Sequence, residues 1–219
     1  QAMYLAKEHG RNRFRYFTAS MQKQAQERLD LLNDLHIALE LGQFELYYQP
    51  IVDLSDNQII KAEALLRWNH PSKGVVSPAD FIPIAEDSGL IVEIGDWVFK
   101  QAVQQVRHCK DKYKLNVQIS VNKSPVQFIA NEDHNDWINV LKNNGVSGED
   151  VVIEITENLL LDNQHNILQQ LHQFRDAGIE VSMDDFGTGY SSLSYLKKFD
   201  IDYLKIDQSF TQGIAPNSD

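Results

Sequence analysis

Two adjacent carboxylates, Asp184 and Asp185, directly follow an apolar, β-prone segment at residues 179–183. A strand of this kind aims the two side chains, and Gly187 and Gly189 allow the following backbone to come close to a ligand. Because two like charges side by side repel each other, the pair favours a bound cation, and oxygen ligands suit Mg²⁺ or Mn²⁺. A solvated Asp-Asp turn on the surface is the alternative interpretation of the pair taken alone.

Other apolar segments carry polar residues near their carboxyl ends, namely Glu63, Asn122, Glu154 and Lys205. A carboxylate inside an apolar strand costs free energy unless it is paired or bound to a metal. A (β/α) barrel or an open α/β sheet brings the carboxyl ends of its strands together, so we expect one shared site. Each residue alone also fits an ion pair or a cap. The 7 histidines show no metal-ligand spacing, which favours Mg²⁺ or Mn²⁺ over zinc.

Strands alternate with amphipathic helices after Gly42, which is typical of an α/β fold with a mostly parallel sheet. A long helix is predicted before this point, over residues 19–41, and a short helix and an edge strand are predicted at 1–9 and 11–17. The predicted strands are 44–54, 59–68, 117–122, 151–156, 180–183 and 203–206, and the predicted helices are 78–88, 91–110, 133–143, 163–177 and 191–197.

The composition is that of a globular protein with a sizeable core: 219 residues, 42% hydrophobic and 23% charged. A net charge of −11 argues against broad binding of DNA or RNA. A small anionic ligand remains compatible if metal ions neutralise the site. The single cysteine, Cys109, excludes an intrachain disulfide and suits the cytoplasm. No apolar run reaches the length of a membrane span, so we expect no membrane contact from this chain, although the longer protein can have a membrane anchor upstream.

Six motifs occur in a fixed order along the chain: Tyr48-Gln49-Pro50, Glu63-Ala64-Leu65-Leu66-Arg67-Trp68, Ser120-Val121-Asn122, Glu154-Ile155-Thr156-Glu157, the loop from Asp184 to Leu193, and Lys205-Ile206-Asp207. Together they resemble the EAL-domain family, phosphodiesterases of the bacterial second messenger cyclic di-GMP. The resemblance extends from about Leu29 to the C-terminus. It implies a TIM-like (β/α) barrel with an antiparallel first strand.

The resemblance implies a two-metal site with Mg²⁺ or Mn²⁺. Glu63, Asn122, Glu154 and Asp184 match the ligands of one ion, and Asp185 matches a ligand of the second. Glu63 and Asp185 are thereby also expected to take part in catalysis. The implied reaction is in-line attack of an activated water on one phosphodiester of cyclic di-GMP, which gives linear pGpG.

The resemblance also implies roles for residues outside the ligand set. Lys205 matches the family lysine that holds or deprotonates the attacking water, and Glu157 matches the glutamate that anchors the loop after Asp185. Substrate contacts are matched by Gln49, Leu65 and Arg67, with Arg67 placed for a phosphate.

The start of the chain resembles the tail of a GGDEF (diguanylate cyclase) domain, through Ala2-Met3-Tyr4-Leu5-Ala6-Lys7 and Gly10-Arg11-Asn12. The expected organisation is a GGDEF remnant at 1–17, a linker or first helix at 18–42, and an EAL domain at 43–219 that lacks its last strands. An open barrel exposes strand edges, so we expect marginal stability of the isolated chain. The family resemblance also makes a homodimer an expectation.

Two other classes of function stay open at this stage. A non-catalytic cyclic di-GMP receptor is the second hypothesis: receptors of this family usually have eroded catalytic motifs, and the motifs present here are intact, which opposes it, whereas the expected absence of the last strands keeps it open. A Schiff-base lyase on a barrel is the third hypothesis, with Lys205 as the nucleophile. The acidic residues oppose the lyase, since adjacent carboxylates hold a lysine protonated.

Overall fold

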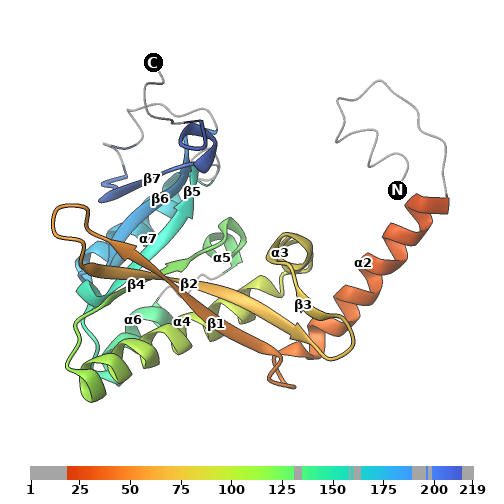
Figure 1. Cartoon of the computed structure of the whole chain (residues 1–219), viewed down its shortest axis with the longest axis horizontal. Helices are drawn as coiled ribbons and strands as arrows, with labels where there is room; N and C mark the ends of the chain where they lie inside the picture. Colours follow the sequence, from red (N-terminus) through yellow and green to blue (C-terminus); the bar gives the residue numbers. More distant parts are fainter. Residues whose placement is uncertain are drawn as a thin grey trace. The chain divides into compact units, whose positions relative to one another are not determined.

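A computed structural model describes residues 19–130, 135–157, 159, 164–188, 196 and 199–213. The chain divides into two compact units: the first comprises residues 1–45 and 68–90, and the second comprises 46–67 and 91–219. The elements expected at 1–9 and 11–17, and almost all of the helix expected at 191–197, lie outside the described residues. Figure 1 shows the elements coloured along the sequence.

The first unit contains α2 (Ala19–Ala38), β3 (Gly74–Val76), α3 (Pro78–Ser88) and one end each of β1 (Phe44–Val52) and β2 (Ile59–His70). Its core is aromatic: Phe44, Trp68 and Phe81 are all buried and their rings pack against one another. The indole Nε1 of Trp68 donates to Gln43 Oε1 at 2.9 Å, so the buried polar atom of this ring is satisfied. This cluster fixes the C-terminal end of β2, which includes Trp68.

The second unit contains the repeated strand–helix pattern. Its elements are α4 (Ile91–His108), η1 (Cys109–Tyr113), β4 (Gln118–Asn122), α5 (Pro125–Ala130), α6 (Asn135–Asn144), η2 (Gly148–Asp150), β5 (Val151–Thr156), α7 (Gln164–Asp176), β6 (Glu180–Phe186), β7 (Tyr203–Ile206) and η4 (Gln208–Phe210). None of the described helices is long and apolar enough to cross a lipid bilayer.

The sheet has the strand order β1-β2-β4-β5-β6-β7, with β3 paired to β2. The pairs from β2–β4 to β6–β7 are all parallel (Figure 1). β1 and β2 form an antiparallel hairpin, because Asp53 N donates to Gln58 O at its closed end and Asn69 N donates to Gln43 O at its open end. The predicted α/β fold with a mostly parallel sheet is confirmed. Within the described residues, no strand pairing joins β7 to β1.

Helices cover the parallel strands of the second unit. α4 contacts β4, α5 and α6, and α7 contacts β6, and Figure 1 shows α4 and α6 running beside each other. Phe99 of α4 stacks on Trp137 of α6 with ring centroids 4.1 Å apart. Residues Val151 to Ile155 of β5 are all buried, as expected for a parallel strand covered on both faces.

Several boundaries differ from those predicted. β1 ends at Val52 because the Asp53 carboxylate accepts from Ser55 N and starts a turn. β6 continues to Phe186, beyond the predicted end at residue 183. The short α5 and β3 were not predicted, since six and three residues are too few to show a hydrophobic period.

Candidate metal and substrate site

Three carboxylates from three strands of the second unit converge at the carboxyl ends of the sheet. Glu63 of β2, Glu154 of β5 and Asp184 of β6 each offer one oxygen, and these oxygens lie within 4.8 Å of one another. The parallel pairing explains the convergence. β4 lies between β2, which carries Glu63, and β5, which carries Glu154, and β5 pairs in turn with β6, which carries Asp184. Residues far apart in the sequence thereby meet in one cluster, which we call the acidic cluster.

Lys205 of β7 lies at the centre of the acidic cluster. Its ammonium donates to Glu63 Oε2 at 2.9 Å, to Glu154 Oε2 at 2.6 Å and to Asp184 Oδ2 at 3.1 Å. Burial alone would lower the pKa of Lys205, but the hydrogen bonds and charges of Glu154 and Glu63 outweigh burial and raise that pKa above its ordinary value. The side chain is therefore a cation, and a free amine for Schiff-base chemistry is disfavoured in this arrangement.

Glu154 is the most buried member, with only 1% of its side chain exposed. Burial raises its pKa, and the hydrogen bond from Lys205 opposes that rise. Three carboxylates facing one ammonium leave an excess of negative charge that a divalent cation balances. An all-oxygen donor set is the kind that hard cations such as Mg²⁺ and Mn²⁺ prefer, so the residues present fit a divalent metal ion.

Asn122 ends β4 beside the acidic cluster. Its Nδ2 donates to Glu63 Oε1 at 2.9 Å, which leaves the amide oxygen available as a further ligand. The next backbone amide, that of Lys123, donates to Glu154 O at 2.9 Å. This hydrogen bond holds the ends of β4 and β5 together, and therefore fixes Asn122 relative to Glu154.

Asp185 differs from its neighbour in conformation. Its φ is +54°, in the left-handed region that non-glycine residues seldom adopt, and its amide donates to Asp184 Oδ1 at 2.9 Å. Its carboxylate is not part of the acidic cluster. Burial and the charges of Asp184 and Asp207 raise the pKa of Asp185, so a nearby cation would stabilise its charged form.

The loop after Asp185 is tied to β5 by Glu157. The Glu157 carboxylate accepts from Gly187 N at 3.3 Å, and the side chain is buried. The structure thus places Glu157 against the loop, where the sequence analysis expected an anchor. The remainder of that loop, residues 189–193, lies outside the described residues.

The expected substrate residues lie on β1 and β2. Leu65 and Arg67 alternate with Leu66 and so share the strand face of Glu63, whereas Gln49 is exposed on β1. Arg67 donates to Leu66 O at 2.9 Å, and its guanidinium lies 5.4 Å from the ring centroid of Tyr47. Tyr47 was not predicted as a site residue, although it lies two residues before Gln49 and therefore on the same face of β1.

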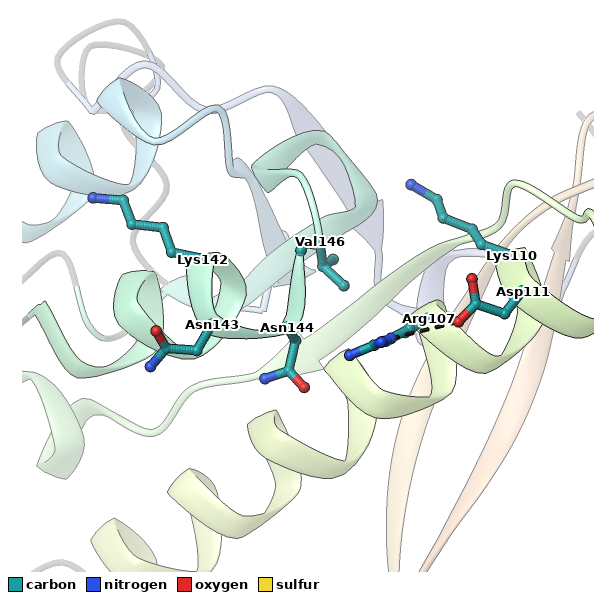
Figure 2. Close-up of a pocket in the computed structure, with 8 residues that line it drawn as sticks. Arg107, Lys110, Asp111, Lys142, Asn143, Asn144 and Val146 are labelled. Carbon is teal, nitrogen blue, oxygen red and sulfur yellow. Dashed lines mark hydrogen bonds and ion pairs between the residues drawn. The ribbon is translucent and has the colours of Figure 1, made fainter.

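A separate pocket of about 490 Å³ lies in the second unit, at the ends of α4 and α6 (Figure 2). Its basic residues are largely paired, since Arg107 contacts Asp111 at 3.4 Å and Lys110 contacts Asp150. Basic side chains are also the usual partners of helix C-termini. None of the residues selected from the sequence lines this pocket.

Comparison with known proteins identifies the family. A family model described as "EAL domain" matches residues 32–219, from within α2 onwards. The chain belongs to the EAL domain family. This EAL chain is 42% identical over 218 residues to the bifunctional diguanylate cyclase/cyclic di-GMP phosphodiesterase MucR of Pseudomonas aeruginosa, covering 100% of this chain and 32% of MucR. It is 40% identical over 213 residues to the cyclic di-GMP phosphodiesterase PdeR of Escherichia coli, covering 97% of this chain and 31% of PdeR.

The chain therefore spans about a third of the length of these curated relatives. Among solved structures, "PaMucR Phosphodiesterase, c-di-GMP complex" matches with a TM-score of 0.79 and 40% identity, covering 84% of this chain and 74% of that one. The cAMP-bound EAL enzyme Bd1971 matches with a TM-score of 0.81 and 36% identity, covering 90% of this chain and 56% of that one. The predicted EAL family and its TIM-like fold are confirmed.

Proposed function

We propose that this EAL domain hydrolyses cyclic di-GMP to linear pGpG with the help of two divalent metal ions. The observation that carries the proposal is the convergence of Glu63, Glu154 and Asp184 around Lys205 at the carboxyl ends of the strands. The names of the relatives support the same reaction, and one solved neighbour is a complex with c-di-GMP.

The acidic cluster and Asn122 would hold the first ion, and Asp185 would contribute to the second. Mg²⁺ and Mn²⁺ suit these oxygen donors. When bound, such ions lower the pKa of water and stabilise the charge that develops on the phosphoryl oxygens. They also neutralise the site toward an anionic substrate, which matters in a chain of net charge −11.

Lys205 would orient the attacking water. Glu154 and Glu63 raise the pKa of Lys205 in spite of its burial, so the side chain is protonated and can donate hydrogen bonds within the site. A protonated lysine can hold the oxygen of a water while its lone pair faces the phosphorus, which supplies orientation. We therefore favour holding the water over deprotonating it as the role of Lys205.

Substrate binding would involve β1 and β2. Arg67 presents a forked cation of the kind that binds phosphate oxygens in pairs. The ring centroid of Tyr47 lies 5.4 Å from that guanidinium, and the ring would limit rotation of the Arg67 side chain. Gln49 and Leu65 are proposed as further contacts to the dinucleotide.

The direct test is chromatography of cyclic di-GMP after incubation with the chain and Mn²⁺ or Mg²⁺, with and without EDTA. We expect metal-dependent formation of pGpG and its loss in Glu63→Gln and Lys205→Met. Glu93→Gln is the matched control, because it neutralises an exposed carboxylate on α4. Turnover that resists EDTA, or near-normal turnover in either site variant, would overturn the proposal. Binding of cyclic di-GMP without product under saturating Mn²⁺ would replace it with a receptor function.

The domain organisation is part of the same proposal. We take residues 43–219 as the EAL domain, 18–42 as a linker or first helix, and 1–17 as the end of a GGDEF domain. The alignment of the whole chain with MucR, whose name includes a diguanylate cyclase, supports this origin. Homodimerisation stays a prediction, which light scattering after size-exclusion chromatography would test.

A further inference from the structure

The chain leaves β6 through an irregular backbone. β6 pairs with β7 at Met183↔Leu204 and again at Phe186↔Ile206, so two residues face one between these pairs. This is the geometry of a β-bulge, which bends a strand and re-aims a side chain. Asp185 has φ +54° within the bulge, and Gly187 has φ +101° just after it. The ladder alone therefore does not hold the Asp185 carboxylate in place.

Hydrogen bonds hold one side of this turn. Thr188 N and Thr188 Oγ1 donate to Asp185 O at 3.3 and 2.9 Å. Gly187 N donates to the buried Glu157 at 3.3 Å, and Asp207 N donates to Phe186 O at 3.4 Å. The backbone groups of the turn thus have hydrogen-bond partners in Glu157, which follows β5, and in Asp207, which follows β7.

An aromatic ring covers the other side. A Cβ added to Gly187 would lie 2.7 Å from Cε2 and 2.8 Å from Cζ of Phe210, so the ring lies directly on the glycine. Phe210 ends η4, which is set by two contacts of its N-cap: Asp207 Oδ1 accepts from Ser209 N at 2.9 Å, and Asp207 O accepts from Phe210 N at 3.1 Å. The ring is thus positioned by the turn that directly follows the strand of Lys205.

We propose that Phe210 is a positioning residue for the second metal site. Its ring packs on Gly187 and stabilises the left-handed backbone at Asp185 and Gly187. This backbone conformation then keeps the carboxylate of Asp185 in position. The inference rests on the proposed function, because Asp185 matters only if it binds an ion. Phe210 lies outside the core, with 56% of its surface open to solvent, and its contact with Gly187 is lost in a substitution to alanine.

Amide hydrogen exchange on the metal-free chain tests the packing without relying on activity. Phe210→Ala should speed exchange at Gly187 and Thr188 about tenfold, because the turn opens more often. Phe210→Tyr keeps the ring and should exchange like the unmodified chain. Tyr113→Ala is the matched control, since Tyr113 is an exposed aromatic residue, with 59% of its surface open, that makes no contact with the turn. Unchanged exchange in Phe210→Ala would overturn the inference.

A Mn²⁺ titration followed by the electron paramagnetic resonance of the free ion tests the link to the metal. Phe210→Ala should weaken the lower-affinity site about tenfold and leave the higher-affinity site unchanged, whereas Phe210→Tyr should restore both. Faster exchange with unaltered Mn²⁺ binding, or a single Mn²⁺ site in the unmodified chain, would also overturn the inference. Hydrolysis by the unmodified chain tests the proposed function separately, so either can fail while the other stands.

Discussion

Lys123→Met should stabilise the chain at neutral pH. Lys123 is 6% exposed and points into the helical layer, where its ammonium lies 4.0 Å from the ring centroid of Trp137 and 5.1 Å from that of Phe128. Burial lowers its pKa from 10.5 to about 8, and the charge of Asp96 opposes that change. Methionine keeps the unbranched stem and removes the buried charge.

The magnitude follows from the difference in pKa between the two states. A fall from 10.5 to about 8 is roughly 2.5 pH units, which at about 1.4 kcal/mol per unit corresponds to about 3 kcal/mol. Between these values the unfolded chain binds more protons than the folded chain, so stability rises with pH. The penalty is therefore fully present below about pH 8 and is lost as pH approaches 10.5. The cation–π contact that methionine gives up offsets about 1 kcal/mol, which leaves a gain of about 2 kcal/mol at pH 7.

Urea unfolding and thermal melts in EDTA at pH 7 and pH 10 would measure this gain. A chain of this size should show a rise in Tm of about 4–8 °C for about 2 kcal/mol at pH 7, with most of the gain gone at pH 10. Lys142→Met, at an exposed lysine on α6, is the matched control and should change stability by less than about 0.5 kcal/mol. A lower Tm at pH 7, or an equal gain at both pH values, would refute the reasoning.

Three further predictions concern the site itself. Lys205→Met should lower the stability of the metal-free chain by about 3–5 kcal/mol, because it leaves the buried Glu154 carboxylate without its cation; thermal melts should also show a larger stabilisation by added Mn²⁺ than in the unmodified chain. Gly187→Ala and Phe210→Ala should be non-additive, because the double variant removes the 2.7 Å clash and leaves only the strain of φ +101°; additive losses in urea unfolding would count against the contact. Arg67→Lys should raise KM for cyclic di-GMP about tenfold with little change in kcat, since an ammonium cannot reproduce a paired phosphate contact; initial rates at saturating Mn²⁺ would show a fall in kcat instead if Arg67 acts on the transition state.

The sequence predicted the parts of the site that depend on regular strands. Glu63, Asn122 and Glu154 lie in or at the end of strands that were recognised from apolar runs, and parallel pairing then brings such ends together. The conformation of Asp185 could not be predicted from the sequence, because a bulge depends on how β6 pairs with β7 and has no characteristic hydrophobic period. The role of Phe210 was hidden for a related reason, since its contact with Gly187 joins two irregular turns.

Lys205 allows the site to fold without a bound metal ion. Without a cation, Glu63, Glu154 and Asp184 would repel one another at the point where three strands must pair side by side. The Lys205 ammonium contacts all three and so acts as an internal counter-ion. A divalent ion held by Glu63, Glu154 and Asp184 would compete for the oxygens that accept these hydrogen bonds, and N–H groups of Lys205 would then be available to a water molecule. One side chain thereby supports the metal-free fold and, in the proposed reaction, orients the nucleophile, which is why stability and turnover should both depend on Lys205 but respond differently to Mn²⁺.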